Sequence, residues 1–429
     1  MMALIAFIGV CVGSFACRYL KGDSQYLAFF IQLGLLVASL AAMVIADHLA
    51  VLFAAWCVSN ILLVRLMVHK KCWKAAKASG WLAARNYVLG SACIAGAFAI
   101  FYSATGLTSI QALVHGPVES SLMLPALGLL LLGAMTQSAI WPFHRWLISS
   151  LNSPTPVSAF MHAGLVNGGG FLLARFAPLY LKHSALLTTI FVIGIATALL
   201  GILWKLMQSD VKRMLACSTM GQMGFMLAQC GLGLFPAAVA HLVWHGMFKA
   251  FLFLASGGAA QEKRYDLGYP PRPFTFFCAL ICGVAGSLGF ASASGKSWFA
   301  ADTTLVLMVA ALLAATQFAL PMLRHKTLQS LPLALIATIL VGLAYGGSVH
   351  LIVWGMEPMH LMQPQPLNGL HIAGITALTL SWLLMLFLRR HQSTDQQPAW
   401  MLKNYVAVLN ASQPHPTTIT AHRNHYQYQ

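Results

Sequence analysis

Residues 236–259 read PAAVAHLVWHGMFKAFLFLASGGA, and this stretch decides the fold class. It carries one charged side chain, Lys249, in a run long enough to cross a bilayer as a helix, which takes about 20 apolar residues. Similar runs recur along the chain, without the alternating ten-residue segments of roughly half-apolar character that mark an outer-membrane barrel. The sequence therefore predicts an all-α polytopic membrane protein.

Composition agrees with that fold class. Of the 429 residues, 59 % are hydrophobic and 8 % are charged, whereas a soluble domain has roughly 25 % charged residues. A soluble enzyme, a disordered protein and a disulfide scaffold are excluded. We expect about thirteen transmembrane helices, at residues 2–20, 26–46, 48–69, 84–104, 122–146, 156–176, 184–206, 212–233, 236–259, 274–292, 302–323, 330–349 and 369–389.

The basic residues predict the orientation. The formal net charge is +16, from 25 Lys and Arg against 9 Asp and Glu. In a soluble protein this excess would suggest nucleic acid, but in a membrane protein basic loops are held in the cytoplasm. With the N-terminus outside, 20 of the 25 fall on the inner side and only Lys182 and Lys296 on the outer side. We therefore expect an inner-membrane protein with an outer N-terminus and a cytoplasmic C-terminus, and no nucleic-acid partner.

Two polar segments stand apart from the apolar runs. Residues 1–390 form the expected transmembrane domain, and residues 391–429, rich in Gln, His, Pro and Thr, form a cytoplasmic tail that we expect to be partly disordered. The stretch 261–273, QEKRYDLGYPPRP, is an inner loop whose prolines separate two helices. These two segments are the expected docking sites for a cytoplasmic partner. The chain opens directly on an apolar run, so we expect its first segment to remain as a helix.

Three ionisable side chains lie inside one predicted span. His241, His245 and Lys249 are spaced i, i+4, i+8 and share one helix face over about 12 Å. Ionisable groups within a membrane are costly and mark ion pathways by default, so this stripe is a candidate proton path. The alternative is that each group caps a carbonyl or belongs to a polar core. A zinc site is disfavoured because no third ligand accompanies the two histidines.

A second cluster lies at residues 152–170, and Gln137 and Pro142 precede it. Prolines there interrupt regular helix, and consecutive glycines allow close backbone approach or unwinding. Broken helices beside polar groups are where transporters build ion paths; a loop followed by a glycine-rich packing face is the alternative. The candidate path residues are Gln137 and His162, and the candidate helix-break and packing residues are Pro142, Pro154, Pro156, Gly168, Gly169 and Gly170.

Three phrases of the sequence resemble a known family. Residues 137–164 (QSAIWPFHRWLISSLNSPTPVSAFMHAG), 209–226 (SDVKRMLACSTMGQMGFM) and 241–257 (HLVWHGMFKAFLFLASG) are similar to the proton-translocating antiporter-like subunits. These are subunit L of NADH-quinone oxidoreductase and the large subunit of Mrp-type antiporters. The similarity spans roughly residues 10–260 and fades beyond. It implies inverted repeats with broken helices, and mid-membrane charges that carry protons.

The resemblance carries over unevenly. The histidine of the PTPVSALIHA motif is kept as His162, and the HxxxHxxxK stripe is kept in full. Where the family has Glu after Trp56, this chain has Cys57, and where the family has Lys in a GKSA motif, it has Gln137. The first half-path therefore lacks its usual Glu–Lys pair, which puts ordinary antiport in doubt.

A narrower group departs in the same direction. Residues 144–180 are very similar to the DabB-type subunit of two-part inorganic-carbon transporters. That resemblance implies an ion-conducting subunit that couples a proton or sodium gradient to bicarbonate or CO2 uptake by a large cytoplasmic zinc protein of DabA type. Zinc is then expected on the partner and no cofactor in this chain, which shows no phosphate-binding, haem or iron–sulfur motif. The alternatives are a proton-pumping subunit of NADH-quinone oxidoreductase or an Mrp antiporter, and a membrane anchor without transport.

Overall fold

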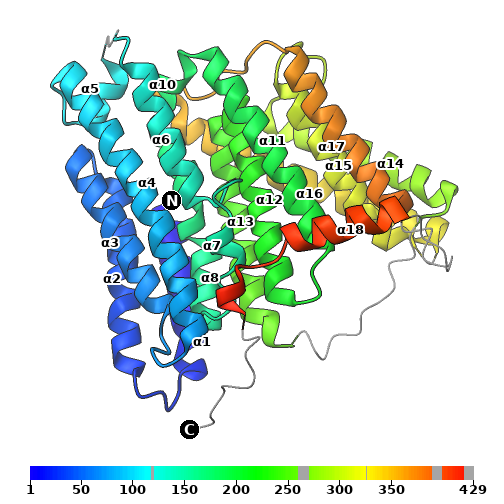
Figure 1. The fold of residues 1–429 in the computed structure, drawn as a ribbon. Helices are drawn as coiled ribbons and strands as arrows, with labels where there is room; N and C mark the ends of the chain where they lie inside the picture. Colours follow the sequence, from blue (N-terminus) through cyan, green and yellow to red (C-terminus); the bar gives the residue numbers. More distant parts are fainter. Residues whose placement is uncertain (117–119, 259–269, 325, 389–398, 420–429) are drawn as a thin grey trace.

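The computed structural model describes residues 1–116, 120–258, 270–324, 326–388 and 399–419, and this part of the chain is a bundle of helices without a β-strand (Figure 1). The first half contains α1 (Met2–Tyr19), α2 (Tyr26–Ile45), α3 (Leu49–Met67), α4 (Lys74–Thr105), α5 (Ile110–His115), α6 (Met123–Gln137), α7 (Arg145–Ile148), α8 (Thr155–Ala163), α9 (Gly168–Arg175) and α10 (Ala177–Leu181). The second half contains α11 (Ser184–Leu206), α12 (Val211–Gly231), α13 (Phe235–Ala255), α14 (Pro273–Ser294), α15 (Thr304–Leu323), α16 (Thr327–Met356), α17 (Gly369–Leu388) and α18 (Ala399–Ala411).

The predicted fold class is confirmed. Each of the thirteen predicted segments coincides with helix, and eleven helical segments of the described chain are long and apolar enough to cross a membrane. The two segments outside that set have physical reasons. Helix α6 has only 15 residues because regular helix ends at Gln137. Helix α12 has 21 residues but carries Lys212, Arg213 and several uncharged polar side chains.

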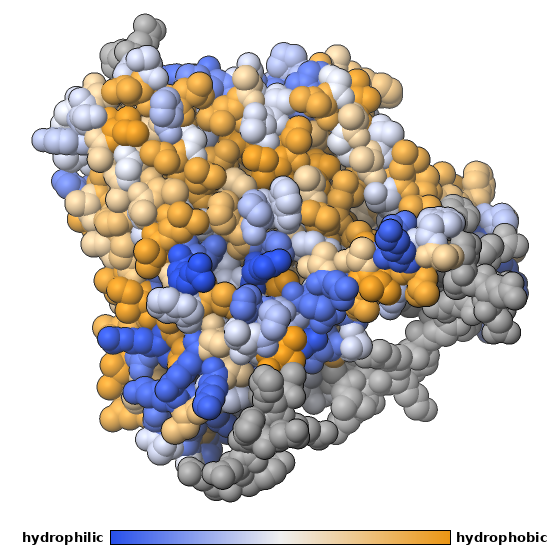
Figure 2. All heavy atoms as spheres, in the orientation of Figure 1, coloured by the Kyte–Doolittle hydropathy of each residue, from blue (hydrophilic) through white to orange (hydrophobic). Residues whose placement is uncertain are grey.

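The helices give the molecule two distinct ends. One end, here called the basic end, gathers the turns at residues 68–73, 149–153 and 207–210 and lies in the lower part of Figure 1. Hydrophilic residues collect in the lower part of the same face, below a broad apolar band (Figure 2). The opposite end holds the turn between α2 and α3, where Asp47 accepts hydrogen bonds from the Ser109 hydroxyl and from the Gln111 N–H. These two bonds lower the pKa of Asp47. The separation matches the charge asymmetry in the sequence, while the membrane orientation stays a prediction.

Close packing between α11 and α12 positions the centre of the bundle. A Cβ on Gly224 would lie 2.5 Å from the Ala198 nitrogen, and one on Gly201 would lie 2.4 Å from the Gly221 nitrogen. Small residues let the two backbones approach closely, as is usual where membrane helices associate. Helix α12 is thereby held beside α11 with its other face turned to α8 and α13.

Part of the C-terminal tail is ordered against the basic end. Residues 399–419 form α18 and a short 3₁₀ turn, Pro416–Thr418. The His415 N–H donates to the Ser149 hydroxyl at 2.9 Å, and the Asn152 amide donates to the Thr418 carbonyl at 2.9 Å. This portion of the tail folds back onto the bundle, while partial disorder of the tail stays a prediction. Residues 389–398 and 420–429 of the tail, and 259–269 of the predicted docking loop, lie outside the described residues.

Candidate ion path

Helix α13 places the predicted stripe on one buried face. Pro236 occupies the first turn, where its missing N–H costs nothing, and the helix then runs unbroken past Lys249. His241, His245 and Lys249 are 9 %, 6 % and 1 % exposed. The two imidazole rings lie nearly parallel, with centroids 6.0 Å apart and an interplanar angle of 16°. The i, i+4, i+8 spacing therefore produces a continuous file of titratable groups inside the bundle.

Lys249 has a backbone carbonyl as its partner, not an acid. Its Nζ donates to the carbonyl oxygen of Leu215 on α12 at 3.1 Å. Among the described residues, the two ion pairs join His69 to Asp23 and Arg175 to Asp47. An ammonium held by one carbonyl is poorly compensated for its loss of water. The site therefore favours a lysine that exchanges its proton over one that stays charged.

A hydrogen-bonded chain connects His162 to Lys249. The Thr219 hydroxyl donates to the same Leu215 carbonyl at 3.0 Å, so its only proton is used there. The Nδ1 of His162, 3.1 Å from the Thr219 hydroxyl, is then the donor to it. His162 also stacks on Phe253 of α13, with ring centroids 4.2 Å apart. The chain from His162 through Thr219 and Leu215 to Lys249 joins α8, α12 and α13 at one point.

The histidines of the stripe keep one nitrogen without a protein partner. The Nε2 atoms of His241 and His245 are buried, and neither has a hydrogen bond within the described chain. Leaving a buried polar atom unpaired costs about 1–3 kcal/mol, so an unpaired atom is expected only where function requires it. A nitrogen that must accept and release a proton, directly or through water, meets that condition.

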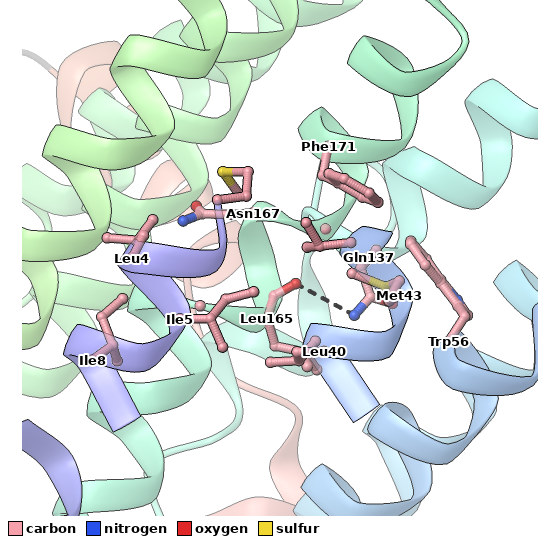
Figure 3. A pocket seen from close by; sticks show the side chains of 14 residues that line it. Leu4, Ile5, Ile8, Leu40, Met43, Trp56, Gln137, Leu165, Asn167 and Phe171 are labelled. Atoms are coloured by element: carbon pink, nitrogen blue, oxygen red, sulfur yellow. Dashed lines mark hydrogen bonds between the residues drawn. The ribbon is translucent and has the colours of Figure 1, made fainter. Parts of the chain in front are cut away.

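Gln137 lies elsewhere, in a charge-free cluster of the first half. Its Nε2 donates to the Asn60 side-chain oxygen at 3.0 Å and approaches the Leu165 carbonyl at 3.4 Å, as Figure 3 shows for the latter contact. Beside it is a small cavity of about 20 Å³, lined largely by apolar side chains that include Leu4, Ile5 and Leu40. A space of this size holds about one water, and Gln137 and Asn167 are the polar residues in its lining.

The predicted helix-breaking residues lie in two breaks of the first half. Helix α6 ends at Gln137, and Pro142 lies in the irregular stretch before α7. Pro154 precedes α8 and Pro156 is in its first turn, while a 3₁₀ turn, Leu165–Asn167, separates α8 from α9. At the start of α9, a Cβ on Gly168 would lie 3.2 Å from Gln137, one on Gly169 2.3 Å from the Ala134 carbonyl oxygen, and one on Gly170 2.4 Å from the Met226 sulfur.

The structure thus divides the predicted path residues into two groups. His162 joins the α13 stripe, while Gln137 pairs with Asn60 in the other cluster. Asn167 lies between the two, donating to the Ala163 carbonyl at 2.8 Å and approaching the Leu242 carbonyl at 3.4 Å. Sequence reasoning missed Thr219, whose only signal is a hydroxyl residue four positions after Leu215 in the phrase 209–226.

Comparison with known proteins agrees with this arrangement. Residues 46–268 match the family model described as NADH:quinone oxidoreductase/Mrp antiporter, transmembrane region. The chain belongs to this family. The match contains both the neutral cluster and the α13 stripe, so the family's membrane scaffold underlies both groups of residues.

Individual relatives span two branches of the family. The chain is 38 % identical over 286 residues to a probable inorganic carbon transporter subunit DabB1 of Halothiobacillus neapolitanus, covering 65 % of this chain and 51 % of that protein. It is 31 % identical over 301 residues to NADH-quinone oxidoreductase subunit L of Escherichia coli, covering 66 % and 49 %. A chain in the structure of the Mrp complex from a Dietzia species shares the fold, with a TM-score of 0.58 at 22 % identity over 96 % of this chain and 51 % of that one. This chain spans about half the length of these relatives.

Proposed function

We propose that this chain is the ion-conducting membrane subunit of an energy-coupled inorganic-carbon transporter. The observation that carries ion conduction is the buried stripe of His241, His245 and Lys249, joined through Thr219 to His162. Protons enter the stripe as exchangeable charges on imidazole nitrogens and on the Lys249 amine. Because the gradient is dissipated through this chain, its energy becomes available to a partner subunit.

Two observations support inorganic carbon as the substrate class. The similarity to DabB1, at 38 %, exceeds that to subunit L, at 31 %. Gln137, which pairs with Asn60, stands where the antiporter-like subunits resembled by the sequence carry Lys. A neutral amide does not titrate, so the first half is not built to exchange a second ion.

The proposed partner is a large cytoplasmic zinc protein that handles CO2 or bicarbonate. We place its docking surface at the basic end, over the tail segment 399–419; the loop 261–273, the other docking segment predicted from sequence, lies largely outside the described residues. The tail segment presents Trp400, Leu402 and Tyr405, which are 67 %, 58 % and 50 % exposed. Exposed aromatic and aliphatic side chains of this size are typical anchors of an interface.

The test is purification of the native complex together with labelled-bicarbonate uptake in cells. Co-purification of a soluble zinc protein, and uptake that depends on both chains and collapses with the gradient, is the expected result. Co-purification with many membrane subunits and iron–sulfur proteins would instead assign the chain to a respiratory or Mrp complex. Deleting residues 399–429 should release the zinc protein; unchanged co-purification would remove the tail as a docking site.

A further inference from the structure

The described residues include one more buried polar side chain beside the stripe, Gln229 of α12. It is 0 % exposed, and within the described chain neither its Nε2 nor its Oε1 makes a hydrogen bond of good geometry, with the Tyr345 hydroxyl of α16 as its polar neighbour. An amide with both atoms unpaired is expensive, at about 1–3 kcal/mol for each lost partner. Apolar residues pack around it: Ala228 precedes it and belongs to a cluster with Ala240 and Phe290. A Met or Leu would cost less here, so the amide calls for a ligand.

The position of Gln229 continues the stripe. His241 contacts Phe225 of α12, with ring centroids 5.7 Å apart. Gln229 follows Phe225 by four residues, so it lies on the same face one turn further along. Since α12 and α13 are antiparallel and joined by a short turn, that direction leads from His241 toward the opposite end. Lys249 lies the other way, beside Leu215 near the basic end.

Beyond Gln229 lies the buried turn between α12 and α13, which contains Leu232 and Leu234. The Tyr345 hydroxyl of α16 approaches the Gln229 side chain. The backbone carbonyl of Gln229 accepts a hydrogen bond from the Leu234 N–H at 3.1 Å. The Gln229 side chain therefore starts just under the turn between α12 and α13. The segment 362–366, whose residues are partly or fully exposed, covers that turn, and its Gln363 N–H donates to the Gly233 carbonyl at 3.1 Å.

We propose that Gln229 holds water between His241 and the opposite end of the bundle, and so carries the outer part of the ion path. The amide N–H groups donate to one water and its oxygen accepts from another. The water nearer His241 passes a proton to the His241 Nε2, which makes the ring an imidazolium, and that water is reprotonated by the next water toward the opposite end. Gln229 is not protonated at any stage; it is a positioning residue that keeps the water in line.

This inference rests on the proposed function, since it needs ions to enter the stripe. It also predicts an unusual combination of effects. Replacing Gln229 by Met removes two unpaired buried atoms and keeps the side-chain length, so the fold should be as stable as before or more stable. A residue that acts only in packing would leave ion flux unchanged, whereas a residue that holds water in the path would not.

The experiment uses membrane vesicles containing the full chain with its native partner subunits. Proton entry is driven by an imposed potassium diffusion potential and followed with a pH-sensitive dye, with thermal stability measured in parallel. We expect Gln229→Met to lower the proton flux at least tenfold without lowering Tm. The control is Gln222→Met, the same change at an exposed position of the same helix, which should leave both quantities unchanged. Tyr345→Phe, which deletes one oxygen, should lower the flux severalfold.

Flux within twofold of the parent in Gln229→Met, at normal Tm, would overturn the proposal. If that variant does not accumulate, Tyr345→Phe decides, and its full flux would likewise overturn it. Lys249→Met in the same vesicles separates the two levels of inference. Loss of flux in Lys249→Met with full flux in Gln229→Met rejects only the outer path, whereas full flux in Lys249→Met rejects the proposed function.

Discussion

Lys249→Met is the sharpest test of the stripe because the structure predicts its effects on stability and on transport separately. The substitution removes one hydrogen bond from a charged donor to the Leu215 carbonyl, worth about 1.5–3 kcal/mol. The Leu215 carbonyl is not left unpaired, because the Thr219 hydroxyl still donates to it at 3.0 Å. The substitution also removes the desolvation penalty of a buried ammonium, which is several kcal/mol and offsets this loss. The variant should therefore assemble and be at least as stable as the parent.

Transport should respond in the opposite way. Without an amine at this position, no proton passes between the His245 region and the basic end, so labelled-bicarbonate uptake should fall to background. Lys249→Arg should fail as well, because guanidinium stays protonated, and His245→Ala should impair uptake by breaking the same file. Complex abundance and Tm are measured alongside, with Lys77→Met, an exposed lysine of α4, as the matched control. Full uptake by Lys249→Met at normal abundance would show that Lys249 is only structural.

Three further predictions concern the rest of the bundle. Gln137→Leu should lower the free energy of unfolding by about 1–3 kcal/mol, because the Asn60 oxygen loses its donor. The same variant should change the proton flux less than twofold. A large loss of flux would place Gln137 in the ion path. Gly169→Ala should reduce folded protein sharply, since its Cβ would lie 2.3 Å from the Ala134 carbonyl oxygen and crowding of this kind costs about 1–3 kcal/mol or more; normal abundance on a blot would contradict that packing. Burial lowers the pKa of Lys296, between α14 and α15, to about 8. Between pH 8 and the unfolded pKa of about 10.4, the unfolded chain binds more protons than the folded chain, so Tm should rise with pH. A rise that persists in Lys296→Met would show that Lys296 is not its cause.

Local composition was enough to predict where the helices cross the membrane, but not where they end. Helix α4 begins at Lys74, ten positions before the predicted segment 84–104, because Lys and Ala extend a helix readily outside the apolar region. Conversely, α6 ends at Gln137 although the predicted segment continues to residue 146. Apolar content measures how well a segment suits the lipid interior. It does not show where regular helix is interrupted, as it is before Pro142.

The stripe on α13 could be predicted from spacing alone, since all three residues lie on one helix. The network that completes it could not, because Thr219 and His162 come from α12 and α8 and meet only through tertiary packing. Gln229 shows the same limit: a glutamine in an apolar run is unremarkable in sequence, and only the structure shows that both amide atoms lack a partner.

The contrast between the two halves has a consequence for coupling. Gln137 and Asn60 partner each other, and neither side chain titrates, so this cluster offers no site for a proton. The second half has a file of titratable groups from Lys249 toward the opposite end, with unpaired nitrogens along it. An exchanger needs two routes with separately controlled charges, whereas among the described residues we propose one route, along the α13 stripe. Under the proposed function, the gradient runs down through that route. Its energy must then be captured by the subunit that docks at the basic end, where the proposed path ends beside Leu215 and the tail is folded back.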